Sequence, residues 1–153
     1  MAFRLLSFRA ATLLALTTLA ACSSKKDDPT PAAPTMGMSW AVDGGNVTAS
    51  SAVAKISGND VTIAGATSNS GGVFIDVPKA AGTYTLTSTS NESATYIVTP
   101  ATGASQSYDS TSGTVIVTSS SATNIAGTFT FTGTSTSGTT TKTLTNGKFN
   151  INY

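Results

Sequence analysis

The stretch "NIAGTFTFTG", residues 124–133, decides the fold of this chain. Ile125, Phe129 and Phe131 fall on alternate positions, and threonines fill most of the positions between them. Successive side chains of a β-strand point to opposite faces, so this pattern places aromatic and aliphatic groups on one face and hydroxyls on the other. The stretch therefore predicts a strand with one buried and one solvated face.

The same alternation recurs along the chain from Met36 onward. It is found in residues 60–65, 82–89, 93–100, 113–119 and 147–153. Turn-forming residues separate these runs, with turns expected at Asp43, Ser57, Asn69, Lys79, Thr111, Thr134 and Asn146. No window after Thr35 has the apolar stripe of a helix. We predict a single all-β domain, residues 36–153, of about nine or ten short antiparallel strands. A β-sandwich is preferred, and a small up-and-down β-barrel is the alternative.

Composition restricts the function classes. Charged residues make up 10% of the chain, whereas the chain holds 21 Ser and 29 Thr. An average soluble protein has about 25% charged residues, so hydroxyls replace charges on this surface. Residues 36–153 carry four lysines and five acids, a net charge of 4 − 5 = −1. A near-neutral domain lacks the basic surface that nucleic acids require, and we expect no nucleic-acid partner.

The N-terminus predicts secretion. Arg4 and Arg9 precede a short uncharged and mostly apolar run, residues 10–21, as in a signal peptide. The run ends in "LAAC", residues 19–22, which resembles the lipobox of bacterial lipoproteins. The resemblance implies a signal peptide over residues 1–21, cleavage before Cys22, and acyl chains on Cys22 that join the protein to a membrane.

The segment after Cys22 predicts where in the cell the protein is located. A run of two serines, two lysines and two aspartates resembles the surface-export signal of Bacteroidota lipoproteins: Ser23, Ser24, Lys25, Lys26, Asp27 and Asp28. The alternative is an ordinary solvated charge run. "PTPAAP", residues 29–34, then completes a stiff tether over residues 22–35. We expect an outer-membrane lipoprotein that faces the cell exterior, with the periplasmic face as the alternative.

The C-terminal third resembles a protein family. "SGTVIVTSSSATNIAGTFTFTG", residues 112–133, and "LTNGKFNINY", residues 144–153, look like an uncharacterised family of Bacteroidota lipoproteins. The resemblance implies an all-β lipoprotein of unknown function and transfers no catalytic residue. Its motif residues are interpreted as fold residues: Gly127 for close packing, Phe129 and Phe131 for the core, and Asn146–Gly147 for a tight turn.

No residue pattern names a catalytic centre. The chain has no histidine, which excludes imidazole bases and histidine metal sites, and no calcium-binding loop motif occurs. We expect no catalytic residue, no metal site and no cofactor. A pair of carboxylates is the one catalytic chemistry left open. Its candidates are Asp43, Asp60, Asp76, Glu92 and Asp109, of which Asp76 is expected to face water.

Binding is therefore the preferred function. Trp40, the sole tryptophan, and Tyr108, expected to be exposed in a polar run, are candidate ligand contacts. Packing in the core or at its rim is the preferred interpretation of Trp40, ahead of ligand contact. Asp109, Ser110 and Thr111 resemble the Bacteroidota O-glycosylation acceptor, which would place a glycan on Ser110 in an outward-facing loop. We predict a non-catalytic binding or adhesion module for a glycan or a protein. A structural or assembly role in the envelope and a carboxylate hydrolase are the alternatives.

Overall fold

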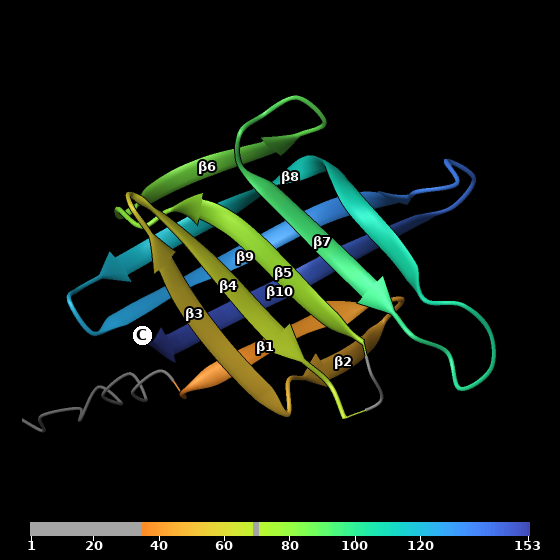
Figure 1. Ribbon diagram of the computed structural model, residues 1–153, viewed down its shortest axis with the longest axis horizontal. Coiled ribbons are helices and arrows are strands. Elements are labelled where there is room, and N and C mark those ends of the chain that lie inside the picture. Colours follow the sequence, from red (N-terminus) through yellow and green to blue (C-terminus); the bar gives the residue numbers. More distant parts are fainter. Residues whose placement is uncertain (1–34, 69–70) are drawn as a thin grey trace, which may run out of the picture. The chain divides into compact units, whose positions relative to one another are not determined.

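The computed structural model describes residues 35–68 and 71–153. Ten strands make up this part of the chain (Figure 1): β1 (Gly37–Val42), β2 (Gly45–Thr48), β3 (Ser51–Ser57), β4 (Asp60–Ala66), β5 (Gly72–Pro78), β6 (Gly82–Thr87), β7 (Ser93–Val98), β8 (Gln106–Ser120), β9 (Asn124–Ser135) and β10 (Thr141–Asn152). The predicted signal peptide, the lipidation site Cys22, the export run and the start of the turn predicted at Asn69 lie outside the described residues.

All ten strands belong to one antiparallel sheet. The strand order is β2-β1-β10-β9-β8-β7-β5-β4-β3, and β6 pairs with β8. The prediction of an all-β chain with about nine or ten antiparallel strands is confirmed. No helix in the described part of the chain is long and apolar enough to cross a membrane.

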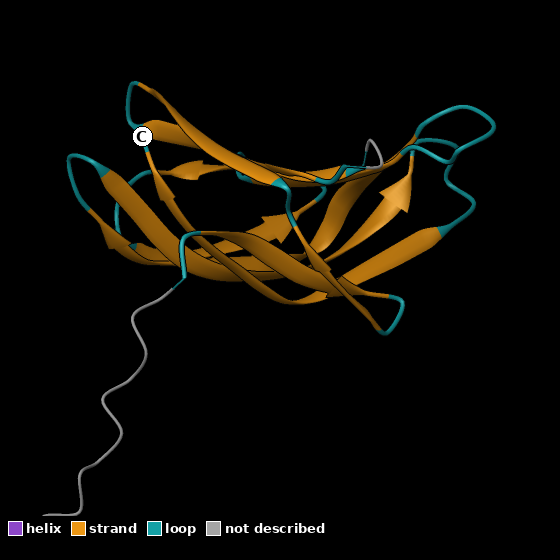
Figure 2. Ribbon diagram, turned by 90° about the horizontal axis from the view of Figure 1, so that it is seen from below, coloured by secondary structure: helices purple, strands orange, loops and turns teal. Residues whose placement is uncertain are grey.

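The sheet curls into a half-barrel with two facing layers. In Figure 1, β3, β4, β5 and β7 cross in front of β8, β9 and β10, and Figure 2 shows the two layers edge-on. Strand β8 links the layers, because its first residues pair with β7 of one layer while β9 of the other layer pairs along its length. Both layers of the expected sandwich are thus parts of one continuous sheet.

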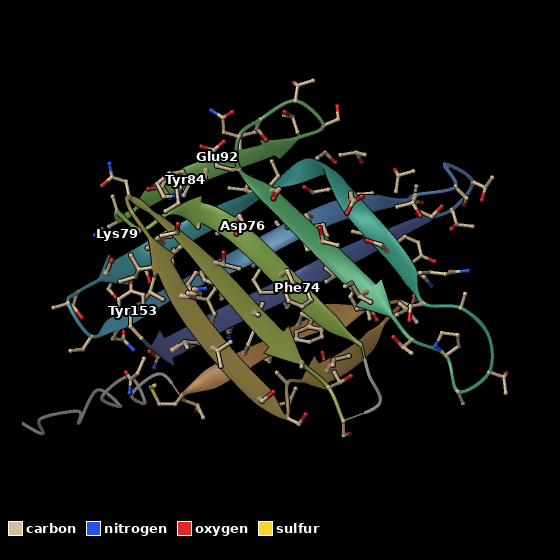
Figure 3. The ribbon with its side chains drawn as sticks, viewed as in Figure 1. Phe74, Asp76, Lys79, Tyr84, Glu92 and Tyr153 are labelled. Carbon is tan, nitrogen blue, oxygen red and sulfur yellow. The ribbon has the colours of Figure 1, made fainter. Side chains whose placement is uncertain are left out.

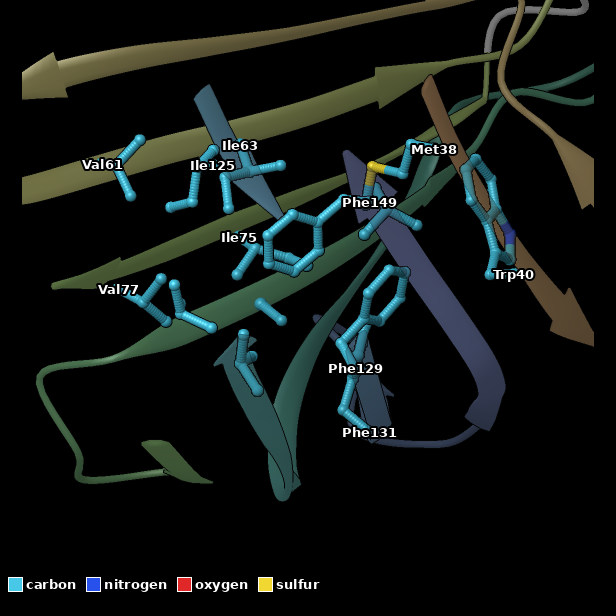
Figure 4. Close-up of a cluster of buried hydrophobic side chains, with 14 of the residues drawn as sticks. Met38, Trp40, Val61, Ile63, Ile75, Val77, Ile125, Phe129, Phe131 and Phe149 are labelled. Carbon is cyan, nitrogen blue, oxygen red and sulfur yellow. The ribbon is translucent and has the colours of Figure 1, made fainter. Parts of the chain in front are cut away.

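The core lies between the layers (Figure 4), where the alternating residues meet. Phe129 and Phe131 are 3% and 1% exposed, as predicted from their alternation. The prediction that Gly127 allows close packing is also confirmed. A Cβ atom added to Gly127 would lie 2.1 Å from the backbone oxygen of Ile116 and 2.5 Å from Cζ of Phe149.

Two predicted turns are wrong, because the residues lie inside strands. Asn146 and Gly147 form a bulge in β10, with Asn146 in the left-handed region at φ 53°. The bulge changes the alternation, so that both Leu144 and Phe149 reach the core. The other wrong turn is the one predicted at Thr111. The pairing of β8 with β9 is irregular between Ser110 and Ser112, but the strand continues through Gly113.

Candidate functional site

Trp40 is held by a tight hairpin between β1 and β2. The two-residue turn consists of Asp43 and Gly44, with φ angles of 52° and 79°. Positive φ at both turn positions is the geometry that matches the twist of paired strands. The hairpin sets Trp40 opposite Val47 of β2. The indole therefore projects from the same face of the sheet as the core residues.

The pairing of β1 with β10 is irregular at Trp40. Ser39 pairs with Lys148, and Ala41 pairs with Thr145, so the register shifts at the residue between them. The bulge of Asn146 lies in the same part of β10. Bulges bend a strand locally and change the direction of a side chain. The irregular register thus fixes the position of the indole ring near the β2 end of the sheet.

The indole nitrogen of Trp40 lacks a hydrogen-bond partner. Trp40 is 2% exposed. Within residues 35–68 and 71–153, its Nε1 is the only fully buried side-chain nitrogen or oxygen without a partner. In Figure 4 this nitrogen lies on the side of the ring away from Met38 and Phe149. A buried polar group without a partner costs about 1–3 kcal/mol, so an incoming acceptor would recover free energy here.

A hollow of about 440 Å³ lies beside this indole. One wall comes from β1 and β2, and the other comes from β7 and the ends of β4 and β5. The lining residues combine aromatic and aliphatic surface with hydroxyl and amide groups: Trp40, Asn46, Val47, Thr48, Thr67, Gly71, Tyr96, Val98 and Thr99. Small-molecule sites have volumes of about 300–1,000 Å³ and this mixture of apolar walls and few polar groups. We call this hollow the Trp40 cleft.

A second hollow, of about 320 Å³, shares four lining residues with the cleft. Its other lining residues are Ser39, Asn146 and Lys148. Strand β2 therefore separates two concave surfaces. Lys148 is the single charged group that lines either of them. The cleft itself is lined by uncharged residues, which favours a neutral ligand.

Tyr96 forms the β7 side of the cleft. Its ring centroid lies 6.2 Å from that of Tyr108 at an interplanar angle of 31°. Burial raises the pKa of the Tyr96 phenol above its ordinary value of 10.0, and the positive charge of Lys142 opposes part of this effect. Lys142 is itself paired with Asp43 of the hairpin turn, and the hydrogen bond to Asp43 raises the pKa of Lys142. Tyr96 is therefore a neutral hydrogen-bonding group at physiological pH.

The raised pKa of Tyr96 predicts a loss of stability at high pH. Above about pH 10 the unfolded chain releases this proton while the folded chain retains it, so the free energy of unfolding falls as pH rises. The variant Tyr96→Phe should show a flatter dependence of melting temperature on pH between 9 and 11. Lys142→Met removes the contribution of Lys142, which has the same direction at higher pH. It also removes the charge that lowers the pKa of Tyr96, so the loss of stability due to Tyr96 should grow. Identical slopes for Tyr96→Phe and the wild type would contradict this assignment.

Two of the site residues predicted from sequence, Tyr108 and Ser110, are buried where exposure was expected. Tyr108 was expected to be exposed, but it is 3% exposed in β8, where its hydroxyl donates to Oε1 of Gln106 at 2.8 Å. The alternation of β8 begins at Gln106 and turns Tyr108 inward, so the prediction of an exposed ligand contact is wrong. Trp40 is as buried as its core interpretation required, yet it also lines the cleft.

The expectation that Ser110 lies in an outward-facing loop is also wrong. Ser110 is 7% exposed within β8, and its Oγ accepts a hydrogen bond of 3.0 Å from the backbone N–H of Ala94. A glycan on this oxygen would displace that bond and the packing around it. Ser110 is therefore a structural residue in the folded domain.

The acids do not gather around a cleft. Asp43 lies in the β1–β2 turn, and Asp60 begins β4. Asp76 is exposed, as expected, and its Oδ1 accepts a hydrogen bond of 2.5 Å from Thr62. Figure 3 shows Asp76 on β5 and Glu92 before β7. Asp109 lies on β8 and accepts from Thr95. No acid lines either hollow. The described residues include no cluster of three or more metal-ligating side chains.

Sequence reasoning missed most of the cleft. Asn46 and Thr48 lie on β2, Tyr96 lies on β7 and Thr99 directly follows β7. No local motif distinguishes them from the other polar residues of the chain. The fact that Trp40 is the sole tryptophan was the one usable signal.

Comparisons with known proteins identify a family for this chain. A family model described as "Domain of unknown function (DUF6252)" matches residues 38–151. No curated protein and no solved structure matches the chain.

Proposed function

The chain belongs to the DUF6252 family, a domain of unknown function, and from that premise we propose that it is a non-catalytic binding module that holds a neutral, polyhydroxylated ligand in the Trp40 cleft. We further propose that it is a Bacteroidota lipoprotein, anchored to the outer membrane through Cys22 and facing the cell exterior. A glycan of the cell envelope or its surroundings fits this chemistry.

The observation that carries the proposal is a buried indole with an unpartnered N–H in the wall of the cleft. Because Nε1 itself has almost no accessible surface, a ligand oxygen reaches it only when the wall beside Trp40 opens. The hydrogen bond then formed satisfies a donor that is unpaired in the closed wall. Sugar hydroxyl and ring oxygens are acceptors of this kind.

The walls of the cleft suit the rest of a sugar. Tyr96, Val47 and Val98 offer apolar surface to its C–H groups, whereas Asn46 and Thr48 offer amide and hydroxyl groups to its oxygens. Aromatic residues with a polar tip serve well where one side of a ligand is apolar and the other is hydrated. A peptide ligand would fill the same volume, and binding experiments separate the two.

A test of binding uses residues 33–153, which form one compact unit. Calorimetric titration with neutral oligosaccharides of glucose, galactose, mannose and N-acetylglucosamine should give binding to at least one. Trp40→Phe keeps an aromatic ring but removes the N–H, and it should weaken this binding about tenfold, the effect of about one hydrogen bond.

The matched control is Tyr84→Phe. It also removes one aromatic hydrogen-bond donor, but Tyr84 lies on β6, where its hydroxyl donates to the backbone oxygen of Ala80. Its affinity should equal that of the wild type. Absence of binding to the whole panel, or equal affinity of the Trp40→Phe variant, would contradict the proposal.

The proposed lipid anchor and surface location are tested separately from ligand binding. Bacterial cells that express the full chain should incorporate labelled palmitate, and Cys22→Ser should abolish the incorporation. Replacing residues 25–28 with alanine should protect the domain from protease added to whole cells. Unchanged protease sensitivity would contradict the export function of the Lys-Lys-Asp-Asp run.

A further inference from the structure

Strand β3 is a free edge of the sheet. It is the last strand in the sheet order and pairs with β4 alone. The two-residue turn at Gly58 and Asn59 makes Ser57 and Asp60 a hydrogen-bonded pair, so every second residue of β3 directs its backbone groups toward β4. The Lys79 N–H donates to the backbone oxygen of Asn59. Asn59 therefore bonds toward β5 while its neighbour Asp60 bonds toward β3, as this alternation of the backbone groups requires.

The remaining backbone groups of β3 point away from the sheet. They belong to Ala52, Ala54 and Ile56, and none has a hydrogen-bond partner within residues 35–68 and 71–153. Soluble proteins normally protect such an edge with a charged side chain, a proline, a bulge or a covering segment. β3 contains neither proline nor bulge over its seven residues, and Lys55 is its single protecting charge. At the start of the strand, Ala52 lines a hollow of about 380 Å³ that it shares with Asn150 and Asn152 of β10. Apart from Lys55, none of these devices blocks the pairing of this edge with another strand.

Apolar side chains reach this edge on the outer face of the sheet. Val53 pairs with Ala64, and Ala64 pairs with Phe74, so the three residues form one row across β3, β4 and β5. Val53 is 60% exposed and Phe74 is 41% exposed, and Figure 3 shows Phe74 on β5 of the front layer. This apolar row ends at the free edge with its most exposed member.

We infer that β3 pairs antiparallel with β3 of a second copy of this chain, about a twofold axis at Val53. In this register the backbone of Ala52 exchanges hydrogen bonds with that of Ala54 in the second copy, and Ala54 does the same with Ala52. Val53 faces Val53 of the second copy in a non-hydrogen-bonded pair, the type in which side chains approach most closely. The two apolar rows then join into one.

The charges of β3 select this register and this partner. Lys55 falls opposite Ser51 of the second copy, and the two Lys55 residues lie four positions apart along the strands. That is about 13 Å, beyond the screening length of about 8 Å at physiological salt. A register centred on Ala54 would bring the two lysines to about 7–8 Å and leave Val53 opposite a lysine. The strand is thus self-complementary about Val53.

Cysteine cross-linking tests the register. Cα atoms of a non-hydrogen-bonded antiparallel pair lie about 4.5 Å apart, within the range of a disulfide. Residues 33–153 form a compact unit that excludes Cys22, the sole cysteine. The variant Val53→Cys of this unit should form a disulfide-linked dimer under mild oxidation. Lys55→Cys is the matched control, and it should form at least tenfold less dimer because its partners lie about 13 Å apart.

Analytical ultracentrifugation tests the association without a cross-link. The wild type should dimerise, Val53→Thr should retain the dimer, and Val53→Lys should weaken it at least tenfold by placing two positive charges at the axis. Val53 is largely exposed, so these variants should fold as the wild type does. A wild type that stays monomeric up to millimolar concentration overturns the inference, as does equal cross-linking of the two cysteine variants.

Discussion

Replacing Gly127 with alanine is expected to lower the free energy of unfolding by about 3 kcal/mol or more. The added Cβ would lie 2.1 Å from the backbone oxygen of Ile116 and 2.5 Å from Cζ of Phe149. Because one of these neighbours is backbone, relief requires β8 and β9 to move apart, and overpacking of this kind costs about 1–3 kcal/mol or more. Urea unfolding followed by the fluorescence of Trp40 measures the effect.

The control for this prediction is Gly45→Ala in β2. There the nearest atom to an added Cβ is the backbone oxygen of Val42 at 3.6 Å, an ordinary contact. The change should leave the free energy of unfolding within about 0.5 kcal/mol of the wild type. Equal effects of the two substitutions would show that the approach of β8 to β9 at Gly127 does not limit packing.

Replacing Phe131 with alanine is expected to cost about 3–5 kcal/mol. Phe131 is 1% exposed and packs near Phe129 with a ring separation of 6.3 Å. Its truncation removes a large buried surface and leaves a cavity between the layers. The matched variant is Phe74→Ala, because Phe74 is 41% exposed on the outer face. Under dilute conditions it should cost less than about 1 kcal/mol, and a cost equal to that of Phe131→Ala would contradict the assignment of the inner face.

The core was predictable from sequence because its signal is local. Phe129 and Phe131 alternate with threonines over one strand, and alternation alone fixes which side chains share a face. No knowledge of the strand order was required for the two phenylalanines. Gly127 belongs to the same pattern, and its role in close packing was implied by the resemblance, but the atoms that leave no room for a Cβ belong to Ile116 of β8 and Phe149 of β10.

The errors arose where turn residues lie inside long strands. Asn146–Gly147 has the chemistry of a two-residue hairpin turn, but Asn also tolerates the left-handed conformation of a bulge. Pairing of both flanks with β9 decides between the two, and that pairing is not visible in the local sequence. The same difficulty affected β8. A strand continues through Ser110 and Gly113, so Tyr108 and Ser110 are buried rather than exposed.

The cleft depends on how the sheet curls. Trp40 could be proposed as a ligand contact because it is the sole tryptophan. The other lining residues Thr48, Tyr96 and Thr99 resemble many residues elsewhere in this threonine-rich chain, so the sequence does not single them out. They meet because the sheet curls until β1 and β2 come close to β7, although β10, β9 and β8 separate them in the strand order. The curvature that brings them together comes from bulges and long-range pairing, which no single stretch of sequence specifies.

The indole N–H resonance of Trp40 tests the proposed binding site most directly. Since the chain has one tryptophan, a ¹H–¹⁵N spectrum of residues 33–153 contains a single indole signal. On titration with the oligosaccharide that binds best, this signal should move downfield and its hydrogen exchange should slow, together with shifts of the Thr48 and Tyr96 amides. An indole signal that stays in place while the domain is saturated with ligand, or a panel that leaves the whole spectrum unchanged, would contradict the assignment of the Trp40 cleft as a binding site.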